Sequence, residues 1–310
     1  MPELPDVTVY VERLAALAGG AVLEKVRLKS SFLLRSVQPS LSAVHGRRVR
    51  GARRLGKRIV LELESELFLV LHLMIAGRLH WKPPGAALGG RIALAAFDFS
   101  TGSLLLTEAS SRKRASLYVV QGEAELALHD RGGVEPLGCT YAEFKARLLE
   151  ENRTLKRALT SPHLFSGIGN AYSDEILHAA GLSPVTLTSR LTPAAIRKLH
   201  RATQSTLQRW TNTLREESKD SFPEKVTAFR PDMAVHGRYL KPCPVCGTAV
   251  QRIRYAENEV NYCPRCQTEG RMLADRSLSR LLGGDWPKTV EAWEEEHPAP
   301  PAAKPADDPA

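Results

Sequence analysis

Two pairs of cysteines near the carboxyl end restrict the fold of this chain more than any other feature of its sequence. Cys243, Cys246, Cys263 and Cys266 form a C-x2-C-x16-C-x2-C pattern, and the segments VQRIRY and EVNY between the pairs favour a β-hairpin. Four thiolates at this spacing can close a tetrahedral shell around Zn²⁺ and leave no open position for water. The pattern predicts one structural zinc ion per chain in a zinc ribbon, against the alternative of four unrelated buried thiols. The fifth cysteine, Cys139, is expected in the core.

Charge is unevenly distributed along the chain. Lys and Arg number 43 against 34 Asp and Glu, a formal net charge of +9. Residues 291–310 hold six acids and one base, so residues 1–290 carry +14. A folded body with this charge attracts polyanions, nucleic acid more than acidic membrane surfaces. The alternative is a basic protein without such a partner.

Targeting signals are absent from the sequence pattern. The longest apolar runs, AALAGGAVL and LFLVLHLMIAG, are shorter than the roughly 18 residues of a membrane span. MPELPDV has neither the basic start nor the apolar stretch of a signal peptide, and an odd number of cysteines argues against a disulfide framework. We therefore expect a cytoplasmic protein, associated with the nucleoid if its partner is DNA, without membrane contact.

Residue patterns change three times along the 310 residues, a length that one hydrophobic core rarely spans. Residues 3–17 have apolar side chains at helical spacing, and short apolar runs separated by glycine then predict a mainly antiparallel β-domain. Thr140 and Thr192 are expected helix caps in a helical domain. We predict an α+β multidomain protein with a β-domain at 1–138, a helical domain at 139–235, the zinc ribbon and a following helix at 236–290, and a disordered acidic, proline-rich tail at 291–310.

Three further segments are weak signals of nucleic-acid binding. The run RRVRGARRLGKR at residues 47–58 has seven basic side chains and no acid, and Arg112 lies in a second basic cluster. Such clusters either bind phosphates or are simply solvated. Gly167, Gly169 and Asn170 in LFSGIGNAYSDEIL precede a helix pattern. They can hold a phosphate at the helix N-terminus, or form an ordinary joint between two helices.

In the order of its motifs, the chain resembles the formamidopyrimidine-DNA glycosylase and endonuclease VIII family of base-excision repair enzymes. The motifs are PELPDV, RRLGKRIVLEL, HLMIAG, LFSGIGNAYSDEIL and VHGRYLKPC, followed by the zinc ribbon, and they cover roughly residues 2–270. This resemblance implies an N-terminal β-sandwich with a leading helix, a helix–two-turn–helix domain and a zinc-ribbon hairpin. DNA would lie in the basic cleft between them.

The resemblance also implies roles for individual residues. After removal of the initiating methionine, the secondary amine of Pro2 would attack C1′ of the damaged nucleotide, which must be flipped out of the duplex. The resulting iminium promotes elimination of the flanking phosphates. Glu3 would move protons at the sugar ring oxygen, and Lys57 would contact the phosphate and the lesion. The other DNA contacts would come from His72, Arg112, Lys156, Asn170 and Asn258.

Three segments depart from the family pattern. Asn258, at the tip of YAENEVNYC, stands where family members usually carry an arginine that grips the lesion phosphates, and asparagine offers no charge. Ile75 aligns with the void-filling methionine, with Met74 beside it, and ASSRKRAS replaces the usual wedge loop. A further 44 residues follow Cys266. Lesion preference and δ-elimination are therefore not implied by the resemblance.

The motifs together favour a bifunctional DNA glycosylase and abasic-site lyase that acts as a monomer on damaged or abasic DNA. One alternative is a non-catalytic binder of damaged or abasic DNA with the same fold. A second is an RNA-binding protein built around the zinc ribbon. Pro2, Glu3 and Lys57 favour the enzyme, because a binder needs none of them.

Overall fold

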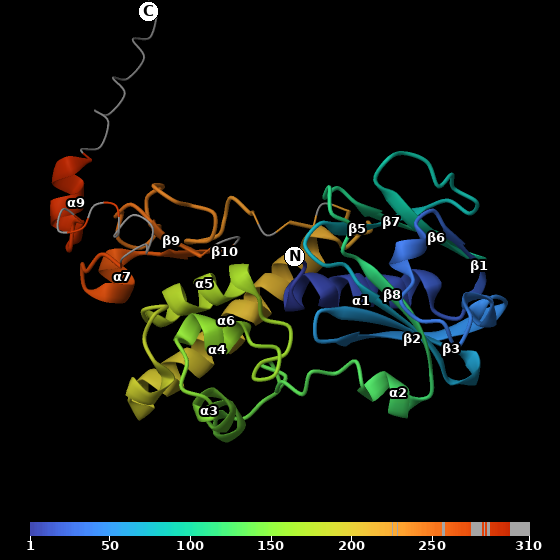
Figure 1. Ribbon diagram of the computed structural model, residues 1–310, viewed down its shortest axis with the longest axis horizontal. Coiled ribbons are helices and arrows are strands. Elements are labelled where there is room, and N and C mark those ends of the chain that lie inside the picture. Colours follow the sequence, from blue (N-terminus) through green and yellow to red (C-terminus); the bar gives the residue numbers. More distant parts are fainter. Residues whose placement is uncertain are drawn as a thin grey trace, which may run out of the picture.

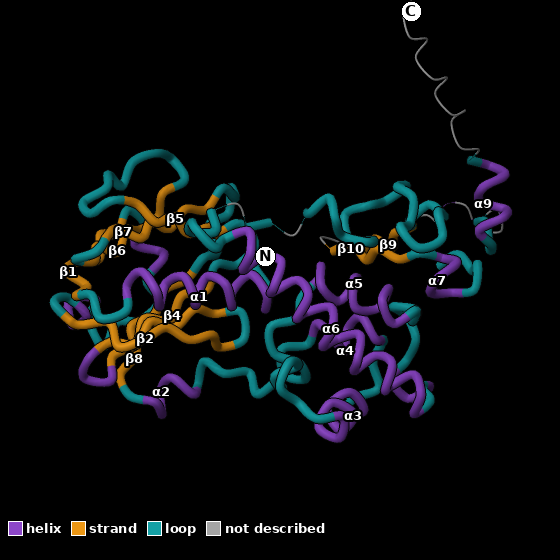
Figure 2. Tube along the Cα trace, turned by 180° about the vertical axis from the view of Figure 1, so that it is seen from behind, coloured by secondary structure: helices purple, strands orange, loops and turns teal. Residues whose placement is uncertain are grey.

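The eight strands of residues 22–121 lie at one end of the molecule, and the helices of residues 141–180 lie at the other, together with the hairpin of residues 251–262 (Figure 1). Helices α1 (Leu4–Ala18) and α6 (Pro193–Glu217) pack against each other between these ends (Figure 2). Of the helices within the described ranges, none combines the length and apolar character that crossing a membrane requires. The computed structural model describes residues 1–224, 226–227, 229–255, 258–273, 281, 283 and 286–297.

Helix α1 opens the chain because its local sequence favours a helical start. Pro5 occupies the first turn, where proline is tolerated, and the side chain of Asp6 accepts the backbone N–H of Glu3 at 2.8 Å. Val7, Tyr10 and Leu14 are fully buried on one face. The helix ends before Gly19, as the helical spacing over residues 3–17 predicts.

Eight strands form a β-sandwich. They are hydrogen-bonded in the order β5-β7-β6-β1-β2-β3-β4-β8, and every pair is antiparallel. Strands β1 and β2 join the two four-stranded halves through Val22 and Leu23. The bounds are β1 (Val22–Leu28), β2 (Arg47–Leu55), β3 (Arg58–Leu63), β4 (Leu67–His72), β5 (Gly77–Lys82), β6 (Ala93–Phe99), β7 (Gly102–Glu108) and β8 (Ser116–Gln121).

One hydrophobic core lies between the two halves of the sandwich. Leu79 and Phe97 enter it from one half, Ile59 and Leu69 from the other, and the buried face of α1 closes it. Side chains from both halves share this core, so the predicted N-terminal β-sandwich with a leading helix is confirmed. A short helix, α2 (Glu123–Ala127), follows β8.

Four helices build a second core around Phe165, Ile176 and Leu199. Thr140 caps α3 by accepting the N–H of Glu143, as predicted. Thr192 likewise caps α6 by accepting the N–H of Ala195 at 3.2 Å. The bounds are α3 (Tyr141–Leu149), α4 (Leu155–Thr160) and α5 (Asn170–Ala180), with α6 as above.

The zinc ribbon is a hairpin of β9 (Gln251–Tyr255) and β10 (Asn258–Tyr262), followed by α7 (Pro264–Thr268). A further helix, α9 (Val290–Glu296), covers residues that the tail prediction placed in a disordered segment, so that prediction is wrong for residues 291–296. Thr289 caps α9, and Val290 is fully buried with its N–H bonded to the carbonyl of Gly270 at 2.7 Å. The expected helix near Leu278 and Leu282, and the tail from residue 298, lie outside the described residues.

Candidate active site

The carboxylate of Glu3 is inserted into the N-terminus of α5, in the other domain. It accepts the backbone N–H groups of Gly169 at 2.6 Å, Ala171 at 2.9 Å and Tyr172 at 3.3 Å. A helix N-terminus stabilises negative charge through its free N–H groups and its dipole. Glu3 is 2% exposed, so these bonds fix its position and connect the β-sandwich to the helical domain.

The side chains of Lys57 and Glu3 both lie against the backbone of Gly169. It lies in the two-residue turn between β2 and β3, where Gly56 has a positive φ of 61°. A Cβ atom added to Gly169 would lie 2.5 Å from both Glu3 Cδ and Lys57 Nζ, so only glycine leaves room for the pair. Burial lowers the pKa of Lys57, and nearby Lys156 lowers it further, whereas Glu3 opposes the shift.

The amino-terminal residue and Lys57 both line a pocket of about 490 Å³. Met1, Arg58, His72 and Arg131 are among the residues that line it, and the backbones of Arg58 and His72 are paired across β3 and β4. Burial, with the positive charges of Arg58, Lys57 and Arg131, lowers the pKa of His72 to about 4. His72 is therefore neutral at pH 7 and offers the pocket a hydrogen-bonding imidazole rather than a charge.

Asp6 is a buried carboxyl beside the amino terminus. One carboxyl oxygen accepts the N–H of Glu3, and the other has no hydrogen-bond partner among the described residues. Burial raises the pKa of Asp6 to about 7, and the charge of Glu3 adds to this effect. Asp6 is therefore a proton-binding group next to the backbone that carries Pro2 and Glu3.

Lys156 belongs to a buried network that joins three parts of the chain. Its Nζ donates to Asp174 Oδ1 at 2.5 Å and to the carbonyl of Asn170 at 2.6 Å. His236, in the linker before the ribbon, bonds to Asp174 Oδ2 at 2.8 Å. Lys156 is 7% exposed, so in this structure it holds α4 against α5, and its contact with DNA stays a prediction.

The ribbon is fastened to α5 by two further side chains. Asn170 Nδ2 donates to the carbonyl of Glu259 at 2.9 Å, and Glu175 accepts the backbone N–H groups of residues 234–236 at 2.8–3.0 Å. The backbone of Asn258 pairs with Tyr255 at the end of the hairpin, and its side chain lies outside the described part of the chain.

The basic clusters lie apart from this pocket, except for Lys57 and Arg58. Arg112 is exposed in the loop between β7 and β8 and does not line the pocket. In the run at residues 47–58, Arg53 pairs with Glu62 and Glu123, and Arg54 pairs with Glu135. Much of the charge in this run is therefore used within the protein.

Four cysteine sulfurs gather at the knuckles of the ribbon, all within 4.8 Å of one another. Three of their separations are 3.3, 3.5 and 3.9 Å. A tetrahedral Zn²⁺ with Zn–S bonds of about 2.3 Å requires sulfurs about 3.8 Å apart, so the cluster fits zinc. His178, on α5, places its Nε2 3.3 Å from Cys243 Sγ.

Comparison with known proteins decides the family. Sequence models match the formamidopyrimidine-DNA glycosylase N-terminal domain at residues 1–130, the H2TH domain of the same enzymes at 133–219, and the zinc finger found in FPG and IleRS at 241–268. The formamidopyrimidine-DNA glycosylase of Heliobacterium modesticaldum is 30% identical over 276 residues, covering 86% of this chain and 100% of the relative. This chain belongs to the formamidopyrimidine-DNA glycosylase family.

Other members of the glycosylase family support the assignment. The enzyme of Variovorax paradoxus is 33% identical over 278 residues, covering 86% of this chain and all of the relative. The crystal structure of the MutM (Fpg) protein of Thermus thermophilus is 30% identical, with a TM-score of 0.72, and covers 86% of this chain and 98% of that one. Lactococcus lactis Fpg, solved with DNA containing an abasic site, shares the fold with a TM-score of 0.75 at 23% identity, covering 86% and 99%.

The comparisons confirm the resemblance, the fold class and the zinc ribbon. The zinc-finger match contains all four cysteines, so the cluster is the structural zinc site of a glycosylase-family ribbon. The named relatives are glycosylases, which favours the enzyme over a non-catalytic binder.

Sequence reasoning missed three residues of this glycosylase-family site, namely Asp6, Asp174 and His236. A signal for Asp174 was present, because α5 is mainly apolar yet carries the adjacent acids Asp174 and Glu175. A charged side chain on a buried helix face requires a partner, and Lys156 is that partner here.

Proposed function

We propose that this protein is a DNA glycosylase that also cleaves abasic sites, with Pro2 as its nucleophile after removal of Met1. One observation carries the proposal. Met1 and Lys57 line one pocket between the two domains, and the fixed carboxylate of Glu3, next to Pro2 in the chain, lies beside Lys57 at Gly169. An N-terminal amine has an ordinary pKa of about 7.7–8.0, so much of it is an unprotonated nucleophile near neutral pH.

The proposed reaction begins at C1′ of a flipped-out nucleotide. The lone pair of the Pro2 nitrogen forms a bond to C1′ while the bond from C1′ to the base breaks, and the base leaves and takes a proton from water. The carboxylate of Glu3 takes the proton that the Pro2 nitrogen now loses and donates it to the ring oxygen as the C1′–O4′ bond opens, which produces an iminium between Pro2 and the sugar. Loss of a proton from C2′ expels the 3′ phosphate and cleaves the strand.

Lys57, His72, Lys156 and Asn170 are proposed to position the substrate strand. Lys57 lies nearest Glu3 and supplies positive charge to a phosphate, and neutral His72 supplies a hydrogen bond from the same pocket. Arg112, which does not line this pocket, and Asn258 are also proposed DNA contacts. Because asparagine lacks a charge, we infer that abasic DNA is cleaved faster than duplex with an intact oxidised purine.

Borohydride trapping tests the proposal. Protein with a carboxyl-terminal tag and a processed amino terminus is mixed with abasic duplex, and borohydride reduces the iminium to a stable covalent adduct. We expect one adduct per active chain, attached at Pro2 in the mass spectrum. The matched control retains an amino-terminal extension, which makes the Pro2 nitrogen an amide and should prevent trapping. An adduct formed equally well by the extended protein, or attached to a lysine, would refute Pro2 as the nucleophile.

A panel of duplexes tests the substrate. The same protein is incubated with duplexes that contain an abasic site or an oxidised base, and base release is measured separately from strand cleavage. Release of a damaged base confirms glycosylase activity, and rapid cleavage of abasic DNA confirms lyase activity. Faster action on oxidised purine than on abasic DNA would contradict the inferred preference.

A further inference from the structure

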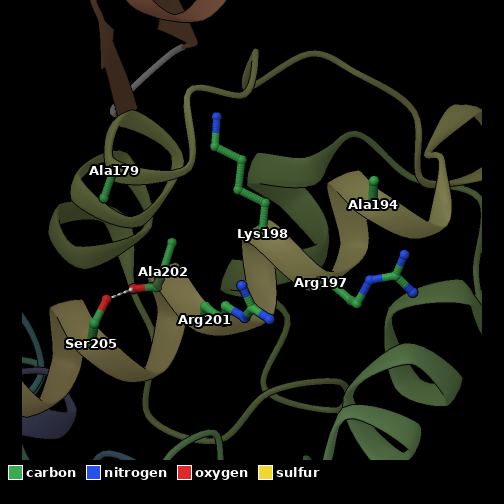
Figure 3. Close-up of a pocket in the computed structure, with 7 residues that line it drawn as sticks. All are labelled: Ala179, Ala194, Arg197, Lys198, Arg201, Ala202 and Ser205. Carbon is green, nitrogen blue, oxygen red and sulfur yellow. Dashed lines mark hydrogen bonds between the residues drawn. The ribbon is translucent and has the colours of Figure 1, made fainter.

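A second basic surface lies on α6, away from the pocket that holds Lys57. Arg197, Lys198 and Arg201 line a hollow of about 510 Å³ together with small side chains of α5 and α6 (Figure 3). None of the residues lining this hollow is acidic. All three cations are exposed, so the hollow presents positive charge to the solvent.

The cations of this hollow have no acidic partner among the described residues, although Arg197 lies over the ring of Tyr141, 6.0 Å from its centroid. Within the described ranges, none of its three cations forms an ion pair, whereas Arg215 on the same helix pairs with Glu12 at 2.6 Å. From residue 193 to 209, α6 carries four Lys and Arg and no acid. A helix stabilised by its own surface charges would alternate acids and bases at this spacing, and this segment does not.

The hollow lies at the junction of the helical domain and the ribbon. Ala179, near the end of α5, lines it. A Cβ atom added to Gly181, which follows α5, would lie 3.1 Å from Lys198 Nζ and 3.3 Å from the carbonyl oxygen of Cys266, so Lys198 reaches the start of the ribbon helix α7. Ala179 is nine residues along α5 from Asn170, the first residue of the helix whose N-terminus holds Glu3. At about 1.5 Å per residue this is about 14 Å, or about four base-pair steps of 3.4 Å.

We propose that this hollow is a second DNA-binding surface, which contacts phosphates of the duplex arm beyond the lesion. The proposal rests on the proposed function, because it takes DNA as the partner. Arg197 and Arg201 are four residues apart on α6, a rise of about 6 Å, which spans about two phosphates of one strand. Large aliphatic and aromatic anchors, which protein partners use, are absent from its lining, so a polyanion is favoured over a peptide.

Binding to duplexes with short and long arms distinguishes a contact at this surface from a contact at the lesion pocket. Two duplexes carry a central abasic analogue, one with covalently linked strands and arms of about three base pairs, which end before the hollow, and one with arms of about 15, long enough to pass it. The test variant combines Lys198→Gln and Arg201→Gln. The control combines Lys25→Gln and Arg91→Gln, two exposed cations of the β-sandwich, so both variants lose the same charge. Dissociation constants are measured by fluorescence anisotropy between 50 and 200 mM salt.

For the long duplex, we expect the test variant to bind on the order of fivefold more weakly at low salt. The slope of log K against log salt should become shallower by about two, one unit per lost phosphate contact. Affinity for the short duplex and cleavage of a short abasic duplex should match the unaltered protein. The control should bind the long duplex at least twice as tightly as the test variant.

Several outcomes would overturn the proposal. Equal loss of affinity for both duplexes would place the two cations at the lesion segment or indicate damage to the fold. An unchanged long-duplex slope, or an equal loss in the control, would leave the hollow without a specific role in binding. If the unaltered protein bound neither duplex, the proposed function would fail together with this inference. If it bound and cleaved the short duplex without any gain from longer arms, only this inference would fail.

Discussion

At the scale of single residues, the tightest constraint is the space around Gly169. Glu3 and Lys57 both approach this position so closely that a methyl group would contact both of them at 2.5 Å. Neither partner can retreat easily, because Glu3 is held by three N–H groups and Lys57 lies in a two-residue turn.

Gly169→Ala should therefore displace the reacting groups while the protein remains folded. A displacement of about 1 Å in a reacting pair can cost on the order of a hundredfold in rate. We expect a loss of this size in single-turnover cleavage of abasic DNA. Gly138→Ala is the control, because a Cβ atom there meets nothing within 4 Å. Full activity in Gly169→Ala would show that the pair is not positioned by this contact.

The raised pKa of Asp6 predicts how the free energy of unfolding depends on pH. Its pKa is raised from 3.8 to about 7 in the folded protein, so the folded state binds a proton more tightly than the unfolded state. The stabilisation from this proton is complete below about pH 4 and is lost as pH rises to about 7, at up to about 1.4 kcal/mol per pH unit. Asp6→Asn keeps an acceptor for the N–H of Glu3 and removes this titration.

Urea unfolding of Asp6→Asn and of the unaltered protein at pH 5 and pH 8 tests this prediction. The free energy of unfolding of the variant, relative to the unaltered protein, should increase between these two pH values. The exposed Asp220→Asn is the matched control and should show no such increase. Parallel pH profiles for Asp6→Asn and the unaltered protein would mean that Asp6 is ionised throughout.

At the scale of elements, α5 organises the site. Its N-terminus holds Glu3, and the adjacent acids Asp174 and Glu175 hold Lys156, His236 and the linker to the ribbon. These contacts join the sandwich, the helical domain and the ribbon to one helix of 11 residues.

Removing Asp174 should therefore destabilise more than a local contact. Asp174→Ala leaves Lys156 buried without its carboxylate, and breaking a buried pair in this way costs about 3–5 kcal/mol. Glu150→Ala breaks the exposed pair with Arg147 and should cost less than about 1 kcal/mol. Chemical denaturation measures both variants. A cost for Asp174→Ala as small as that for Glu150→Ala would show that the buried pair contributes little to stability.

Elements with a clear residue pattern were predictable from the sequence. The capping threonines located the starts of α3 and α6, and the apolar run LFLVLHL located β4. Strand β2 was not separable from a loop, because seven of the twelve residues 47–58 are basic and Val49 is the one buried side chain of the strand. Arg53 of this strand is paired by Glu62 and Glu123, and a local pattern cannot reveal partners from other elements.

At the scale of the whole molecule, zinc determines how the ribbon is held. Two of the four cysteines precede the hairpin and two lie at the start of α7, and His178 of α5 contacts the sulfur of Cys243. Binding of Zn²⁺ to such a site supplies folding energy to the ribbon, since the separate strands have little core of their own. The spacing of the cysteines predicted this cluster, but the docking of α5 against it depends on contacts between distant residues.

Metal analysis should give one zinc per chain. Cys263→Ser removes a ligand, so we expect loss of the zinc and at least tenfold weaker binding to abasic duplex, while the sandwich stays folded. Cys139→Ser is the control, because this thiol is outside the cluster and should leave the zinc content unchanged. A Cys263→Ser protein with full zinc content and normal DNA affinity would contradict a four-cysteine site.

Binding of the Glu3 carboxylate at the N-terminus of α5 also determines at which stage of protein synthesis the site can form. The amino terminus leaves the ribosome first, whereas the N–H groups that orient its neighbouring carboxylate belong to residues 169–172 and are made much later. The sandwich alone does not contain an assembled site. A half-synthesised chain, or one cut between its two domains, therefore lacks the groups that orient Glu3, and under the proposed mechanism it would not attack DNA before the helical domain is in place.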